Sequence, residues 1–117
     1  MPAGRQVHKV LEIIAKAAES KQAIDLKILD LSKTSNIVDY LVVCSGESEP
    51  QIQAIKKEVD SELRKNKIKG YKWEGVIGSG WVVLDLGWIV VHVMGMAERE
   101  RYQLEYLWGK DAIVYHY

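Results

Sequence analysis

The sequence contains little cysteine and proline, no phenylalanine, and no net charge. Its single cysteine, Cys44, cannot form an intramolecular disulfide, and one thiol cannot build the usual structural zinc site. Sixteen lysine and arginine residues balance sixteen aspartate and glutamate residues, so the chain lacks the broad positive field that holds a nucleic-acid backbone. These shortages argue against a disulfide scaffold, a zinc module and a sequence-independent DNA-binding protein.

Long apolar runs are also missing. Five charged side chains interrupt the first twenty residues: Arg5, Lys9, Glu12, Lys16 and Glu19. That stretch therefore lacks the apolar core of a signal peptide, and no other segment reaches the roughly 20 apolar residues that a membrane span requires. With no repeat, low-complexity tract or flexible linker, residues 1–117 are predicted to form one domain, in the cytoplasm and away from membranes.

The residues that are present favour a globular fold, because 48% are hydrophobic and 27% are charged. Apolar residues recur at helical spacing over 7–18, which predicts an amphipathic helix. Residues Ile24–Ile28 alternate between apolar and polar, which predicts a strand with one exposed face. The run Tyr40–Cys44 shows no such alternation and predicts a strand covered on both faces, at the centre of a sheet.

Further signals define the second half of the chain. Ser48 and Gln51 have the form of a capping box, so a second helix is predicted to begin there. A short strand over 71–74 and two β-rich runs, Trp81–Asp85 and Trp88–Met94, follow, with the two runs predicted to form a hairpin. We predict a final helix over Glu98–Trp108, with Gly109 as its stop. The predicted order is αββαβββα, an α/β (α+β) fold with a mixed sheet flanked by helices.

Tests for catalytic motifs are mostly negative. Gly78-Ser79-Gly80 begins like a dinucleotide-binding fingerprint, but Val83 replaces its third glycine and a strand follows where a helix is needed. Cys44 and His92 could form a nucleophile and its base, yet Cys44 lies in the most apolar run of the chain, where a thiol behaves as a buried hydrophobe. We therefore predict no catalytic residue and no cofactor.

The histidines do not indicate a metal either. His8, His92 and His116 have none of the spacings that metal ligands use. His92 lies in an alternating run, so it is either a half-buried structural imidazole or a polar contact on a binding face. The sequence leaves both readings open.

Two other functions are alternatives. Ser45-Gly46 could serve as the turn of a nucleotidyltransferase, but Asp85-Leu86-Gly87 lacks the second carboxylate that two metal ions would need. An enzyme using Asp85 is the first alternative. The second is an RNA-binding assembly module using the basic residues between Lys56 and Lys69, although acidic residues are interleaved with them and favour an ordinary solvated helix face.

Aromatic residues concentrate in the last third of the chain. About half of them must fill the core of a protein without phenylalanine, and the others have the Trp, Tyr and Arg mixture of interface hot spots. The predicted partner-binding residues are Trp81, Val82, Asp85, His92, Arg101, Tyr102, Glu105 and Trp108.

A series of short motifs carries a family resemblance over about residues 5–111. It comprises Asp39-Tyr40 with Val42 and Cys44-Ser45-Gly46, then Gly80-Trp81, Leu84-Asp85, Val91-His92-Val93, Arg101-Tyr102, Leu104-Glu105 and Leu107-Trp108. Each piece is weak, but together, in this order, the chain resembles the Iojap/RsfS family of ribosomal silencing factors.

This resemblance implies a domain similar to nucleotidyltransferases but without enzymatic activity. The implied partner is ribosomal protein L-fourteen of the large ribosomal subunit. A factor bound there sterically blocks association with the small subunit and represses translation, with a related role in assembly of the large subunit. The resemblance also implies a homodimer.

Overall fold

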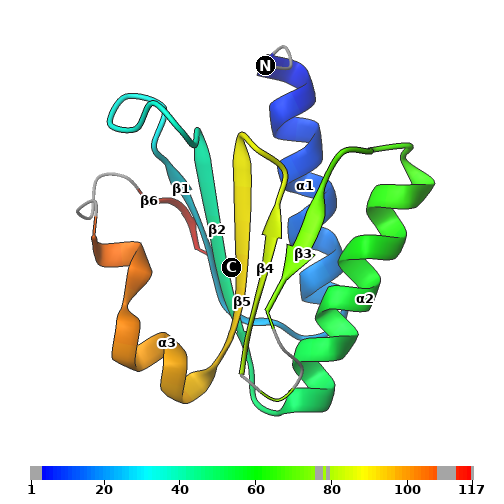
Figure 1. Ribbon diagram of the computed structural model, residues 1–117, viewed down its shortest axis with the longest axis vertical. Coiled ribbons are helices and arrows are strands. Elements are labelled where there is room, and N and C mark those ends of the chain that lie inside the picture. Colours follow the sequence, from blue (N-terminus) through cyan, green and yellow to red (C-terminus); the bar gives the residue numbers. More distant parts are fainter. Residues whose placement is uncertain (1–3, 76–77, 79, 108–112, 117) are drawn as a thin grey trace.

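The computed structural model describes residues 4–75, 78, 80–107 and 113–116. Its elements are α1 (Gly4–Ser20), β1 (Ile24–Asp30), β2 (Tyr40–Gly46), α2 (Glu49–Lys65), β3 (Lys72–Glu74), β4 (Trp81–Asp85), β5 (Ile89–Gly95), α3 (Met96–Tyr102), the 3-10 turn η1 (Leu104–Tyr106) and β6 (Ile113–His116). The strands form one six-stranded sheet in the order β3-β4-β5-β2-β1-β6. β2 and β5 run parallel and the other neighbours antiparallel, so the sheet is mixed, as predicted (Figure 1).

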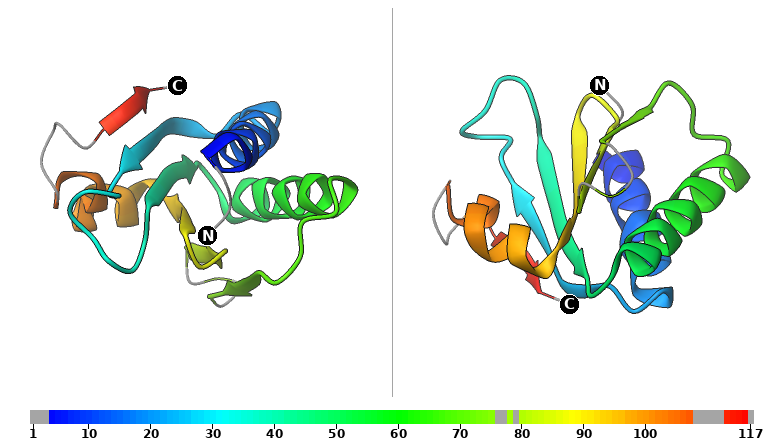
Figure 2. Two further views of the ribbon diagram at one scale, coloured as in Figure 1. Left: turned by 90° about the horizontal axis from the view of Figure 1, so that it is seen from above. Right: turned by 60° about the horizontal axis from the view of Figure 1, so that its bottom comes forward.

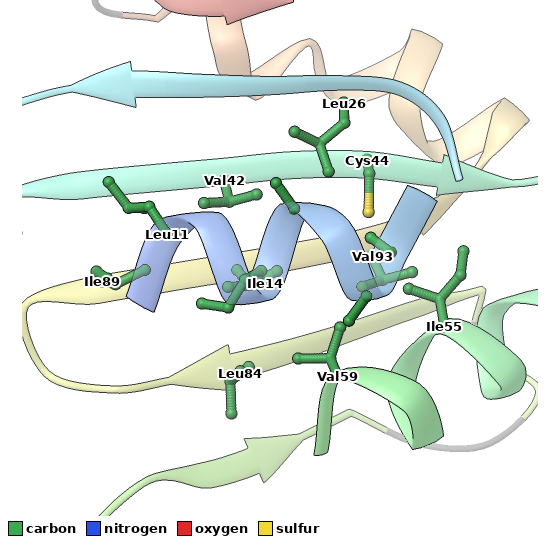
Figure 3. Close-up of a cluster of buried hydrophobic side chains, with 14 of the residues drawn as sticks. Leu11, Ile14, Leu26, Val42, Cys44, Ile55, Val59, Leu84, Ile89 and Val93 are labelled. Atoms are coloured by element: carbon green, nitrogen blue, oxygen red, sulfur yellow. The ribbon is translucent and has the colours of Figure 1, made fainter. Parts of the chain in front are cut away.

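Helices lie on both faces of the sheet. α1 and α2 pack together on one face, and α3 lies against the other (Figures 1 and 2). Most of the core lies between the first two helices and the sheet, where Ile14 of α1 and Ile55 of α2 are fully buried near Val93 of β5 (Figure 3). Within the described residues, no helix combines the length and apolar character needed to span a bilayer.

The predicted cap of α2 is confirmed. The Ser48 hydroxyl accepts a hydrogen bond from the Gln51 backbone N–H at 3.2 Å, which satisfies a donor that the first turn leaves without a helical partner. The Gln51 side-chain amide donates to the carbonyls of Lys21 at 3.2 Å and Gln22 at 2.9 Å. The cap therefore also ties the start of α2 to the end of α1.

The predicted central strand and hairpin are confirmed as well. β2 is buried from Leu41 to Gly46 and pairs with β5 on one side and β1 on the other. β4 and β5 pair in an antiparallel hairpin, and Leu86 donates its N–H to the Ile89 carbonyl at 2.9 Å. Gly87 at the tip has φ 86°, a conformation that glycine adopts without a steric cost.

The prediction that β1 has one exposed face is wrong. Its residues 26–29 are buried in succession, including Lys27. Leu29 packs with Leu41, Val43 and Met94 in a second, smaller core cluster on the face that carries α3. β6 also pairs with β1, so β1 is an interior strand, covered by elements that are distant in the sequence.

The predicted final helix is wrong in its bounds. α3 begins at Met96 and ends at Tyr102, because Gln103 adopts a left-handed conformation with φ 46°. The turn η1 follows, and Trp108 lies outside the described residues. β6 is absent from the predicted order. Its Ile-Val-Tyr run has β propensity, but four residues are too short for a periodicity argument.

Candidate protein-binding surface

Alternation along β4 and β5 places Trp81 and His92 on the face that carries α3. In β4 Trp81 is half-buried, whereas its neighbour Val82 is buried with the core beneath α1 and α2. In β5 His92 is half-buried between two buried valines. Successive side chains of a strand point to opposite faces, and Val83 is the register partner of His92. Trp81 and His92 are therefore diagonal neighbours on one face.

Trp81 is held between His92 and Tyr102. Its indole Nε1 donates a hydrogen bond to His92 Nδ1 at 2.9 Å, and the two ring centroids are 5.7 Å apart. The Tyr102 ring, carried by α3, lies 5.0 Å from the Trp81 ring, with 46° between the planes. These separations are those of favourable aromatic pairs. Two strands and a helix thus fix the indole.

Arg101 adds a positive charge beside the aromatic rings. Its guanidinium carbon lies 5.7 Å from the Tyr102 ring centroid, and both side chains are exposed, Tyr102 by 48%. We call Trp81, His92, Arg101 and Tyr102 the Trp81 patch. It offers aromatic surface, hydrogen-bonding groups and one cation, the combination that is enriched at protein interfaces.

His92 contributes no charge to this patch at neutral pH. Burial lowers the pKa of its imidazole to about 4, because the charged form is disfavoured away from water. Its hydrogen bond with Trp81 uses the neutral form, since the indole N–H can only donate and Nδ1 must accept. The structure therefore shows the half-buried imidazole of the first reading, and the second reading, a polar contact on a binding face, stays a prediction.

A buried ion cluster lies beneath α3 and η1. We use this name for Lys27, Arg99 and Glu105, which are 7%, 8% and 4% exposed. Arg99 Nε donates to Glu105 Oε2 at 2.8 Å, and Arg99 Nη1 donates to the Ser45 hydroxyl at 3.1 Å. Arg99 Nη2 donates to the Asp25 carbonyl at 2.7 Å. The cluster fastens α3 and η1 to β1 and β2.

Lys27 completes this cluster from β1. Its ammonium group donates to the Tyr106 hydroxyl at 3.1 Å and lies 3.8 Å from Glu105 Oε2. Burial acts to lower the pKa of Lys27, but the Tyr106 hydrogen bond and the nearby Asp25 and Glu105 outweigh it and raise the pKa above its ordinary value. Lys27 and Arg99 were not predicted. Both look like ordinary surface charges in the sequence, since the partners that bury them come from distant segments.

The structure brings four of the predicted partner-binding residues together as the Trp81 patch. Val82 is buried in the core on the opposite face of the sheet, and Glu105 is buried in the ion cluster, so neither side chain forms part of this surface. Asp85 lies four residues along β4 from Trp81, roughly 13 Å away. Its carboxylate accepts a hydrogen bond from the Gly87 N–H at 2.7 Å and so shapes the hairpin tip. Trp108 lies outside the described residues.

Groups that could perform catalysis are unfavourably placed. Cys44 is fully buried, and burial raises the pKa of its thiol to about 12, so the thiol is protonated at neutral pH, as the sequence predicts. Among the described residues, no three or more His, Cys, Asp and Glu side chains are grouped so as to hold a metal ion. Gly46 of the candidate nucleotidyltransferase turn lines a hollow beside the start of α2, and the other lining residues include Glu47, Glu49 and Glu98. Their negative charge opposes a phosphate ligand.

The basic segment of α2 is largely an ordinary helix surface. Arg64 pairs with Asp60 at 3.0 Å and Lys65 with Glu62 at 3.0 Å. Lys56 lies over the Trp73 ring, 5.5 Å from its centroid. These local pairs partly offset the positive charge, in keeping with the prediction of a solvated face.

The chain matches the protein-family model described as "Ribosomal silencing factor during starvation" over residues 5–116. This match covers nearly the whole sequence. The chain belongs to the RsfS family. The resemblance in its short motifs is thereby confirmed.

Individual RsfS relatives agree with this assignment. The chain is 42% identical over 100 residues to a protein named ribosomal silencing factor RsfS from Bacillus subtilis, covering 86% of this chain and 85% of the relative. A crystal structure of a protein from Chromobacterium violaceum, 31% identical, superposes with a TM-score of 0.82 and covers 88% of this chain and 87% of its own. The predicted mixed α+β fold is thus confirmed by its similarity to a solved structure.

A more distant relative comes from mouse. It is named "Mitochondrial assembly of ribosomal large subunit protein 1" and is 26% identical over 101 residues, which cover 84% of this chain and 44% of the relative. The matched region is therefore less than half of the mouse protein.

Proposed function

We propose that this chain is a ribosomal silencing factor that binds ribosomal protein L-fourteen on the large ribosomal subunit. Bound there, it sterically blocks association with the small subunit and represses translation in the cytoplasm. A related role in large-subunit assembly is supported by the name of the mouse relative. A homodimer is part of the same proposal, because the family resemblance implies it.

The observation that carries this proposal is the Trp81 patch in a chain of the RsfS family. An indole fixed by His92 and Tyr102 is preorganised, so little side-chain entropy is lost when a partner covers it. The patch bears one cation and no anion, which suits a protein surface better than a phosphate backbone that needs many basic contacts. Glu105 helps to hold α3, which carries Tyr102, through its hydrogen bond with Arg99, whereas Val82 lies in the core on the opposite face of the sheet. Asp85 and Trp108 remain predicted partner contacts.

We further propose that the chain acts without catalysis. Steric exclusion needs only an interface that survives competition with the small subunit. The high pKa of Cys44 and the acidic hollow beside α2 support this view. Magnesium-dependent nucleotidyl transfer by the purified chain, abolished by Asp85→Asn, would contradict it.

Co-sedimentation with purified ribosomal subunits tests the proposed partner. The wild-type chain should pellet with large subunits and not with small subunits or joined ribosomes. Trp81→Ala should weaken this binding by about 30-fold to 1,000-fold, equivalent to about 2–4 kcal/mol, as truncation of an interface hot spot does. Subunit joining, followed by light scattering, should then proceed despite the variant.

Trp73→Ala is the matched control. Trp73 is also a half-buried strand tryptophan, but it lies on β3 and donates its indole N–H to Asp60 of α2 at 3.1 Å, outside the Trp81 patch. It should bind large subunits within about threefold of wild type. Both variants are measured below their unfolding temperatures, because Trp81 also packs on the smaller core cluster. A folded Trp81→Ala variant that still blocks joining at equal concentration would exclude this surface.

A further inference from the structure

The hydrogen bond between Trp81 and His92 determines which groups of the Trp81 patch can reach a partner. Tryptophan has one side-chain donor and no acceptor. Its donor, Nε1, is directed at His92 Nδ1 at 2.9 Å. The indole can therefore offer a partner its apolar surface, but its N–H is already engaged within the chain.

The same hydrogen bond fixes the tautomer of His92. A neutral imidazole carries a proton on one nitrogen only. Since Nδ1 accepts from Trp81, the proton of His92 is on Nε2. The indole N–H of Trp81 is thus used within the chain, and the Nε2–H of His92 is the donor that this pair of rings can offer to a partner.

This Nε2–H donor has no acceptor within the described part of the chain. His92 Nε2 donates to no acceptor among the described residues, and across them only Glu105 Oε1 is a buried side-chain polar atom without a partner. Since His92 Nε2 is also absent from the buried atoms without a partner, the described residues do not enclose this nitrogen. A partner that covers the Trp81 patch would bury this donor, and the donor then needs an acceptor, because an unpaired buried donor is costly.

We propose that His92, and not Trp81, supplies the specific hydrogen bond of this interface, and that the partner protein places an oxygen acceptor opposite His92 Nε2. Trp81 then supplies apolar contact area, and His92 both positions the indole and determines specificity. The inference rests on the proposed function, since it assumes that a protein partner covers the patch.

Three variants separate the two roles. In His92→Asn, the side-chain oxygen can still accept from Trp81 in the place of Nδ1, but no donor extends to the position of Nε2. In Trp81→Phe, the indole N–H is lost, and the His92 tautomer is no longer fixed by it. The imidazole can still carry its proton on Nε2 and donate from there to a partner. Trp73→Phe serves as a control outside the patch. Each variant is titrated against purified large subunits, and its fold is checked by thermal unfolding.

His92→Asn should weaken binding by about 5-fold to 100-fold, the effect of leaving an acceptor of the partner unpaired. Trp81→Phe should lose less than His92→Asn, because it removes only part of the apolar area. Trp73→Phe should bind like the wild type. The NMR signal of the Trp81 indole N–H, assigned by its disappearance in Trp81→Phe, should stay at a hydrogen-bonded position in His92→Asn.

The opposite ranking would overturn the inference. If Trp81→Phe loses more affinity than His92→Asn, the indole N–H is the recognition group. If His92→Asn keeps the native Trp81 signal and binds like the wild type, His92 has only a structural role. If His92→Asn does not fold, Trp81→Phe still decides the question, because a loss beyond 10-fold would contradict the inference. Failure of the wild type to bind large subunits would instead overturn the proposed function together with this inference.

Discussion

The two faces of the sheet are covered by different kinds of side chain. The face under α1 and α2 is closed by aliphatic side chains such as Ile14, Ile55 and Val93, all fully buried. The face under α3 combines a small apolar cluster with the buried ion cluster and the half-buried Trp81 patch. The first face supplies stability through burial of apolar area. The second fixes particular side chains in particular positions, as recognition requires.

The largest expected loss of stability comes from a change in the buried ion cluster, and we compare it with a change in the aliphatic core. Arg99→Ala leaves Glu105 buried without its closest cation and should lower the free energy of unfolding by about 3–5 kcal/mol. It should also release α3, so that Tyr102 leaves Trp81 and the indole N–H signal shifts. Chemical denaturation and NMR measure the two effects.

Ile55→Ala is the matched change on the other face. It should lower the free energy of unfolding by about 2–5 kcal/mol through loss of packing, but the Trp81 signal should stay in place. If Arg99→Ala costs less than about 1 kcal/mol, or if both variants move the Trp81 signal alike, the two faces do not differ as described.

A smaller effect is the pH dependence of the free energy of unfolding, to which His92 of the second face contributes. Burial lowers the pKa of His92 to about 4 in the folded chain, whereas an unfolded histidine has a pKa of about 6.5. The unfolded state therefore binds the proton first as the pH falls. The stabilisation is complete above about pH 6.5, declines towards pH 4, and amounts to at most about 3 kcal/mol.

His92→Asn isolates this contribution, because all other titrating groups are common to both proteins. The difference in unfolding free energy between wild type and variant should shrink as the pH falls from about 6.5 to about 4. A difference that is constant over this range would show that His92 titrates alike in the folded and unfolded chains.

The smallest effect belongs to Cys44, which lies in the aliphatic core. Cys44→Ala should cost roughly 1 kcal/mol or somewhat more through lost packing, and binding to large subunits should persist. In the native chain a thiol reagent should react slowly, since the group is fully buried and its pKa is raised to about 12. The unfolded chain in denaturant is the control and should react quickly. Rapid native labelling would contradict the described core.

The aliphatic face could largely be predicted from the sequence. Helical periodicity over residues 7–18, the unbroken apolar run of β2 and the β4–β5 hairpin are local patterns, and the structure contains all three. The aromatic patch could be predicted only in part. Trp81, His92, Arg101 and Tyr102 are recognisable as candidates, but Val82 was assigned to the surface and lies in the core.

By itself the sequence determined the order of the elements up to α3, the burial of Cys44 and the family, because each depends on residues close together in the chain or on their order. Tertiary structure alone decided the end of α3, the burial of β1 on both faces and the role of the charged residues. Arg99 donates a hydrogen bond to Ser45, which is 54 positions away in the sequence, and Lys27 donates one to Tyr106, which is 79 positions away. No local pattern encodes such pairs. Whether a charge is solvated or buried, and which nitrogen of His92 carries its proton, depends on neighbours that only the folded chain brings together.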